Sequence, residues 1–166
     1  MKIILILLLC LLVIFLSYKF FVYYKSRQYF FQNIYDFCGY LQSEISFLKT
    51  DIKTLLNKKN DSYGSNFNKV LMSYEKALKD IDNFRNNFRN ELDKVAILKD
   101  DEKEQLCDFF EILGTSNSFD QLAQIGDFKS KFSSILGFSK QENQKYGSMS
   151  VKLGILFAVA IFIVFI

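Results

Sequence analysis

The sequence predicts an all-α protein, an antiparallel helical bundle flanked by one transmembrane helix at each end. Every residue from Ile3 to Leu16 is apolar, and so is every residue from Leu153 to Ile166 except Gly154. The 166 residues include no proline, so nothing interrupts helices in the way that proline does. Apolar residues in the middle recur at spacings of three and four, and no segment alternates with a period of two, so no strand is expected.

Residues 1–24 are predicted as the first transmembrane helix. The apolar run continues past Ser17 to Val22, which gives the roughly 20 residues that cross a bilayer core. Lys19 can extend toward the headgroups, and the neighbouring tyrosines suit the interface. A cleaved signal peptide would need a site of small residues after the run. Because the segment from Ser17 to Phe21 is mostly bulky, an uncleaved anchor is favoured.

Residues 148–166 are predicted as the second transmembrane helix, with Lys152 as the only charged side chain near its start. Positive charge gathers on the side of both spans that faces the middle of the chain, which is typical of the cytoplasmic side. We therefore expect a protein of the cell membrane whose residues 25–147 form a cytoplasmic helical domain. The basic residues concerned are Lys19, Lys25 and Arg27 after the first span, and Lys140, Lys145 and Lys152 before the second.

The first helix of the middle is predicted to continue from the first span to about Leu56. Apolar residues repeat there at alternating spacings of four and three, which is a heptad seam. Such a seam fits either a dimer zipper or the inner face of a bundle, and partner helices in the same chain favour the bundle. The seam consists of Ile34, Cys38, Leu41, Ile45, Leu48, Ile52 and Leu55.

Residues 57–66 are polar and are predicted to form a loop. The stretch 67–98 that follows is helical, and its pattern allows one helix or two. The asparagines between Asp82 and Asn90 make a break there plausible. The expected apolar face consists of Phe67, Leu71, Tyr74, Leu78 and Ile81, continued by Phe84, Phe88, Leu92 and Val95.

Two further helices have clear end signals. Asp101 with Glu104 resembles a capping box at the start of the third helix, and Gly114 is its expected stop. Ser118 with Gln121 repeats the start signal for a fourth helix, which is expected to run through Tyr146 into the second span. The two helices would form an antiparallel hairpin across Gly114–Asn117. Their apolar faces are Leu106, Phe109, Phe110 and Leu113, and Leu122, Ile125, Phe128, Phe132, Ile135 and Leu136.

Catalytic chemistry is not predicted, and neither is a metal or a cofactor. The chain has no histidine, its seven glycines are isolated, and Cys38 and Cys107 lie on or beside apolar faces where buried, unreactive thiols are expected. Cys10 belongs to the first span, and the absence of a CxxC spacing suits a reducing compartment. The basic residues lie beside a membrane span, so we interpret them as lipid-facing topology signals and expect no nucleic acid.

The strongest charge feature is the segment Asp100–Glu111, where six acidic residues meet only Lys103. Two interpretations stay open at this point. The acids could contact a basic partner, or they could favour a helix start through the macrodipole and otherwise be solvated. The candidate partner interface consists of Asp100, Asp101, Glu102, Glu104, Asp108 and Glu111.

Scattered motifs along the chain resemble those of the stage III sporulation protein AB family. Leu41–Ile45 is similar to its L-x-x-EI element through Glu44 and Ile45, although the usual proline after it and the tryptophan of the second helix are missing. Asn117 replaces the usual aspartate of the hairpin element. The other matching positions are Leu113, Gly114 and Gln121 at the hairpin, and Lys145, Tyr146 and Gly154 at the last span.

This resemblance implies a cytoplasmic domain similar to type II secretion F proteins. It further implies a non-enzymatic platform in the channel-like complex between mother cell and forespore, on the mother-cell side of the membrane around the forespore. Its partners would be a secretion-type ATPase, other membrane proteins of the complex and membrane lipid, with homo-oligomers possible. The alternative function is a homodimeric coiled-coil membrane tether unrelated to sporulation. A pore-lining subunit is disfavoured because neither span carries polar residues at membrane depth.

Overall fold

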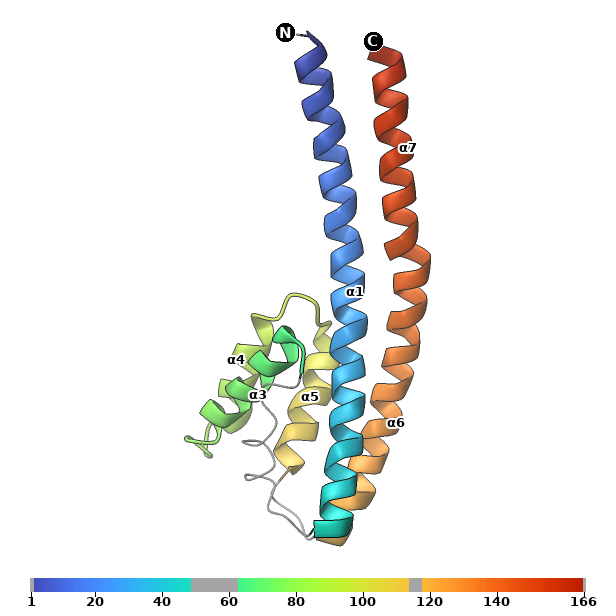
Figure 1. Ribbon diagram of the computed structural model, residues 1–166. Coiled ribbons are helices and arrows are strands. Elements are labelled where there is room, and N and C mark those ends of the chain that lie inside the picture. Colours follow the sequence, from blue (N-terminus) through green and yellow to red (C-terminus); the bar gives the residue numbers. More distant parts are fainter. Residues whose placement is uncertain (1, 49–62, 114–117, 166) are drawn as a thin grey trace. The chain divides into compact units, whose positions relative to one another are not determined.

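A computed structural model describes residues 2–48, 63–113 and 118–165 (Figure 1). These residues are helical apart from short connections, and none of them forms a strand, which confirms the all-α prediction. The chain divides into two compact units. The terminal unit is Met1–Gln28 with Gly137–Ile166, and the central unit is Tyr29–Leu136. The helices are α1 (Lys2–Leu48), α3 (Ser65–Ala77), α4 (Phe84–Asp93), α5 (Asp100–Ile112), α6 (Ser118–Glu142), the π-helix η1 (Asn143–Gly147) and α7 (Ser148–Phe165).

Helix α1 is a single helix of 47 residues. The prediction that the first apolar helix continues into the middle of the chain is therefore confirmed as far as Leu48. The expected continuation to Leu56, and with it Ile52 and Leu55 of the seam, lies outside the described residues, as does most of the predicted loop 57–66. Helix α3 already begins at Ser65, so the last two residues of that loop are helical.

The heptad seam of α1 faces the interior of the central unit. Ile34, Cys38, Leu41 and Ile45 are all buried in its core. Burial of an aliphatic side chain is worth about 1.5–3 kcal/mol, so these contacts are a large part of the stability of the unit. The seam is used within the chain, as the bundle interpretation expects.

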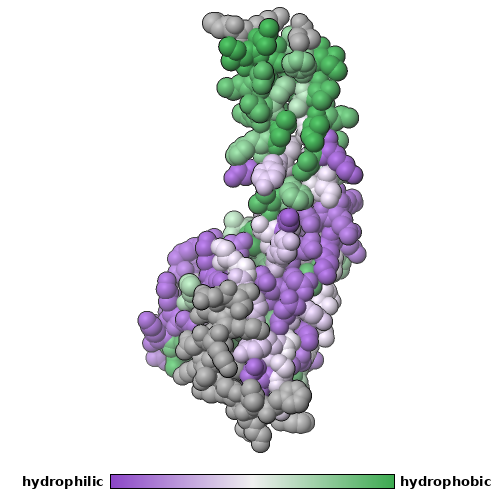
Figure 2. All heavy atoms as spheres, viewed as in Figure 1, coloured by the Kyte–Doolittle hydropathy of each residue, from purple (hydrophilic) through white to green (hydrophobic). Residues whose placement is uncertain are grey.

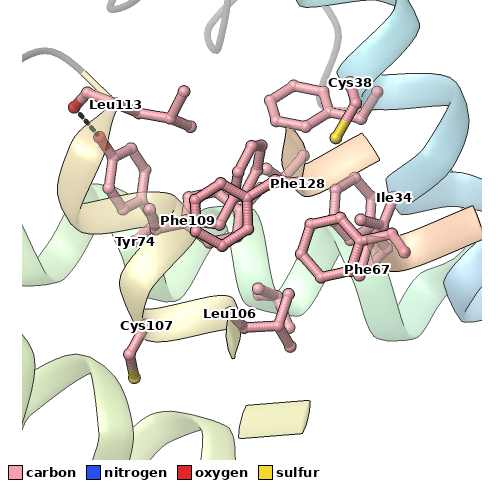
Figure 3. Close-up of a cluster of buried hydrophobic side chains, with 14 of the residues drawn as sticks. Ile34, Cys38, Phe67, Tyr74, Leu106, Cys107, Phe109, Leu113 and Phe128 are labelled. Atoms are coloured by element: carbon pink, nitrogen blue, oxygen red, sulfur yellow. Dashed lines mark hydrogen bonds between the residues drawn. The ribbon is translucent and has the colours of Figure 1, made fainter. Parts of the chain in front are cut away.

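Phenylalanine rings dominate this core (Figure 3). The ring of Phe37 on α1 lies 5.5 Å from that of Phe67 on α3 and 6.5 Å from that of Phe109 on α5. The ring of Phe109 also lies 5.5 Å from that of Phe128 and 5.4 Å from that of Phe132, which holds α5 against α6. Three of these four pairs are edge-to-face and the Phe109–Phe128 pair is tilted, and aromatic pairs add about 0.5–1.5 kcal/mol each beyond the burial of their area.

The second predicted stretch is two helices, and its break comes earlier than expected. The chain leaves α3 after Ala77 and enters α4 at Phe84, whereas the break was expected between Asp82 and Asn90. The Asp80 carboxylate accepts hydrogen bonds from the side-chain amides of Asn83 (3.2 Å) and Asn87 (3.3 Å). These bonds between side chains link the turn after α3 to the first turn of α4. Ile81, expected in the core, lies in this turn and is 78% exposed.

The predicted start of the third helix is wrong by two residues. Lys99, with an extended backbone, is the N-cap of α5, and its N–H donates to the carboxylate of Glu102 at 2.9 Å. Glu102 therefore plays the part that was assigned to Glu104, because its buried side chain reaches back over the first turn. Helix α6 begins at Ser118 as predicted, while Gly114 and the hairpin turn lie outside the described residues.

The terminal unit pairs the first part of α1 with α7. Both helices are long and apolar enough to cross a membrane. Most of their leucine, isoleucine, valine and phenylalanine side chains are exposed, and they form the strongly hydrophobic surface of Figure 2. A soluble monomer rarely exposes such a continuous apolar surface. These features fit a membrane protein.

Candidate functional site

The predicted acidic interface lies on α5, and α4 supplies positive charge to it. The guanidinium of Arg85 on α4 pairs with the carboxylates of Asp108 at 2.8 Å and Glu111 at 2.6 Å, and also with Glu104. The hydrogen bonds that Arg85 donates to these carboxylates raise its pKa above the ordinary value. One arginine thus spans two turns of the acidic helix.

A second group of pairs covers the first turn of α5. Arg89 contacts Asp100 at 3.3 Å and Glu104 at 3.2 Å. Lys103 reaches Asp93 at 2.9 Å and Asp100 at 3.2 Å. The hydrogen bond from Lys103 lowers the pKa of the Asp93 carboxyl, and the same bond raises the pKa of Lys103. The acidic segment is therefore part of an ion-pair network that joins α4 to α5.

The six candidate interface residues consequently have three different environments. Asp100, Glu104, Asp108 and Glu111 belong to the network, and Glu102 is buried as the capping carboxylate. Only Asp101 is exposed with no ion pair among the described residues. Neither of the two interpretations of the acidic segment includes these intramolecular pairs. The spacing of Arg85 and Arg89, four residues apart on one helix face, is the sequence feature that could have indicated them. Whether the surface binds a partner stays a prediction.

A second polar cluster lies in the terminal unit, where α1 meets the end of α6 and η1. Arg27 is only 2% exposed, and its Nε donates to Oε2 of Glu142 at 3.0 Å. Asn143 donates from its side-chain amide to Oε1 of Gln28 at 2.7 Å, and the rings of Tyr24 and Tyr146 lie 5.8 Å apart.

Small residues allow α7 to approach α1 closely. Gly154 is buried, and a Cβ atom there would overlap the Ser17 side chain. Four residues further on, the carbonyl of Ala158 accepts a hydrogen bond from Sγ of Cys10 at 3.3 Å. Close backbone approach over glycine and alanine is how helices associate in lipid, where burial from water contributes little. In the sequence, Gly154 stands out only as a motif position, and no local pattern indicates its contact with Ser17.

The π-helix η1 shifts by one residue the set of α7 positions that contact α1. Ser139 is buried, and a regular seven-residue repeat from it would place Tyr146 and Leu153 in the contact. These two side chains are instead 45% and 42% exposed, and the buried positions are Gly147 and Gly154, each one residue later. A π turn accommodates one extra residue in a helix, which accounts for the shift. The predicted continuous helix from Ser118 into the second span is thus right in extent but contains this wider turn.

The family-motif positions do not converge on one site. In the central unit, Ile45, Leu113 and Gln121 are buried, and Glu44 is partly buried. The carbonyl of Leu113 accepts a hydrogen bond from the Tyr74 hydroxyl at 3.1 Å, drawn in Figure 3. In the terminal unit, Gly154 lies at the α1–α7 contact, whereas Tyr146 of η1 and Lys145 are exposed, with the Tyr146 ring 5.8 Å from that of Tyr24. Gly114 lies outside the described residues. Apart from Lys145 and the undescribed Gly114, most of these positions therefore contribute to packing within the two units.

The thiols of the central unit have the environment expected of unreactive cysteines. Both Cys38 and Cys107 are buried. Burial raises the pKa of Cys38 to about 12 and that of Cys107 to about 11, so both are protonated at neutral pH. Among the described residues, no three His, Cys, Asp or Glu side chains are grouped so that they could hold a metal ion.

The fold and these clusters define a class of protein, a helical domain joined to a pair of apolar helices that fit a membrane. Within that class, the chain belongs to the stage III sporulation protein AB family, whose family model matches residues 2–166. No curated protein and no solved structure matches the chain. Nearly the whole chain is covered, so the family assignment indicates a role in sporulation.

Proposed function

We propose that this protein is a non-enzymatic membrane platform of the secretion-like complex between mother cell and forespore, and that its central unit docks a cytoplasmic ATPase. One observation carries the proposal. A helical unit with its own aromatic core lies in the sequence between two helices able to cross a membrane, in a chain of a sporulation family. A folded domain held at a membrane is what a platform requires.

The proposal places the central unit in the cytoplasm, because basic residues flank both spans on that side. Single exposed cysteines introduced as Asp101→Cys or Lys79→Cys test this placement. In intact cells, a membrane-impermeant maleimide should leave both positions unlabelled, and permeabilisation should expose them. The native Cys38 and Cys107 are buried and so interfere little. Labelling of intact cells would contradict the cytoplasmic placement.

Asp101 is the residue through which we propose that α5 contacts a basic surface of the ATPase. It is the exposed carboxylate of the candidate interface that is not occupied by α4. Asp101→Lys should weaken binding of the full chain in detergent to the purified ATPase by about tenfold, as rim charges at interfaces affect association. Asp127→Lys, the same charge change on the exposed side of α6, is the matched control. If the ATPase bound both variants with equal affinity, α5 would not be part of the contact.

Deletion of the gene tests the sporulation platform as a whole. The deletion should block sporulation after engulfment while vegetative growth continues, and a normal spore yield would count decisively against the proposal. The tether alternative receives no support from the seam residues that the structure describes, since Ile34, Cys38, Leu41 and Ile45 are buried within the chain. Ile45→Asp should therefore unfold the central unit, whereas a tether predicts a folded chain that has lost its dimer.

A further inference from the structure

The terminal unit carries an unbalanced positive charge. Its only acidic side chain is Glu142, and that carboxylate is bound to the buried Arg27. Five lysines of this unit have exposed side chains, and they lie on the part of α1 that follows the first apolar run and on the helices that lead to the second. We refer to Lys19, Lys25, Lys140, Lys145 and Lys152 as the lysine collar.

The helix pairing places part of the collar at one level of the terminal unit. Ser17 contacts Gly154 across the pair, and the antiparallel register continues to the contact of Tyr24 with Gly147. Lys19 follows Ser17 by two residues, and Lys152 precedes Gly154 by two. Both lysines therefore lie at the same height, about 3 Å from that contact, beside the apolar stretches of the two helices.

A pocket opens on α1 at this level. It has a volume of about 270 Å³ and is lined by Lys19, Phe20, Tyr23 and Tyr24. Among the described residues, its wall is aromatic and its single charged group is the Lys19 ammonium, which lies 5.2 Å from the centre of the Phe15 ring on the apolar side. A ligand that combines an anionic headgroup with apolar chains matches this surface, because its phosphate can meet the ammonium while its chains lie along the leucines of α1.

We propose that the pocket at Lys19 binds an anionic phospholipid, whose phosphate is held by Lys19 and by the positive field of the collar. The lipid belongs to the leaflet at which the lysine collar lies. This inference rests on the membrane location in the proposed function, but it is independent of ATPase docking and of which side of the membrane the central unit faces.

The experiment uses the full chain in phosphatidylcholine vesicles, with flotation as the check of insertion. Increasing fractions of phosphatidylglycerol brominated on its acyl chains are introduced, and quenching of tyrosine fluorescence gives its binding constant relative to brominated phosphatidylcholine. The chain has no tryptophan, so its tyrosines report directly. Wild-type protein should favour the anionic lipid, and this preference should shrink as salt rises.

Lys19→Gln should reduce the preference about fivefold, and Lys19→Arg should retain it. Lys131→Gln is the matched control. Lys131 is also exposed and lies over a ring of its own helix, Phe128 at 4.6 Å, but it belongs to the central unit. No preference in the wild type, or an equal loss with Lys19→Gln and Lys131→Gln, would overturn the site. Failure of the wild type to enter vesicles would overturn both the site and the membrane location, whereas failed ATPase binding with intact lipid preference would overturn the docking role alone.

Discussion

Arg27 and Glu142 form an ion pair, 3.0 Å from Nε to Oε2, between residues separated by 115 positions in the sequence. The arginine is almost fully buried and the glutamate is partly exposed. Beside them, Gln28 bonds to Asn143, the first residue of the π-helix. Charge and amide pairs therefore fix the register of α1 against the last helical stretch at the edge of the apolar surface.

Breaking this ion pair should destabilise the terminal unit. Glu142→Gln leaves the buried arginine without its carboxylate, and we expect a loss of about 2 kcal/mol, less than for a fully buried pair because Glu142 keeps some contact with water. The midpoint of SDS-induced unfolding in mixed micelles measures it. Glu142→Asp should recover part of the loss, while Lys140→Gln, an exposed neighbour, should have no effect. Equal midpoints for wild type and Glu142→Gln would show that the pair contributes nothing.

Gly154→Ala should weaken the contact between α1 and α7. The added methyl group meets the side chain of Ser17, so the helices must separate, at a cost of about 1–3 kcal/mol. Gly137→Ala is the matched control, because a Cβ atom there would meet no described atom within 4 Å outside its own helical backbone and chain neighbours, and alanine is the better helix former. We therefore expect opposite shifts of the SDS unfolding midpoint. If Gly154→Ala were as stable as Gly137→Ala, the close approach at Ser17 would be refuted.

Deleting Gln144 should be tolerated. This exposed residue lies in the π turn, and removal of one residue there lets the chain continue as a regular α-helix while Gly147 and Gly154 keep their places. Deleting Leu156, an exposed residue of the regular helix α7, should instead rotate Ala158 by about 100° away from Cys10. Unfolding midpoints compare the two deletions. The same large loss in both would contradict the role of the π turn as a one-residue shift.

The α4–α5 network should make stability fall in acid. Hydrogen bonds from Lys103 and Arg89 lower the pKa of Asp93 in the folded protein. The contribution of the Asp93 carboxylate to the free energy of unfolding is therefore complete above the unfolded pKa of an aspartate, about 3.9. The contribution is lost as the pH falls through the lower folded pKa. Thermal unfolding followed by circular dichroism between pH 6 and pH 2 should therefore show a smaller acid loss for Asp93→Asn. Asp127→Asn, outside the network, should follow the wild type.

Secondary structure was largely predictable because its signals are local. The seam residues Ile34–Ile45 and the face of α6 follow helical spacing and are buried or partly buried in the core, while the apolar ends are continuous runs that stay largely exposed. The failures occurred at helix ends, where polar side chains form local hydrogen bonds. Asp80 and Asn83 ended α3 before Ile81 could reach the core, and Glu102 capped α5 ahead of Asp101. Hydropathy periods do not include such bonds.

The sequence by itself determined that this is a helical protein with an apolar helix at each end and no evident catalytic chemistry, because composition and spacing carry that information. Tertiary structure alone decided how the charges are used. It placed Arg85 and Arg89 over the acids of α5, and it brought Glu142 to Arg27 across most of the chain. It also selected Gly154 over Leu153 for the helix contact through the π turn. Pairing between distant residues depends on the three-dimensional register of whole helices, which no local pattern encodes.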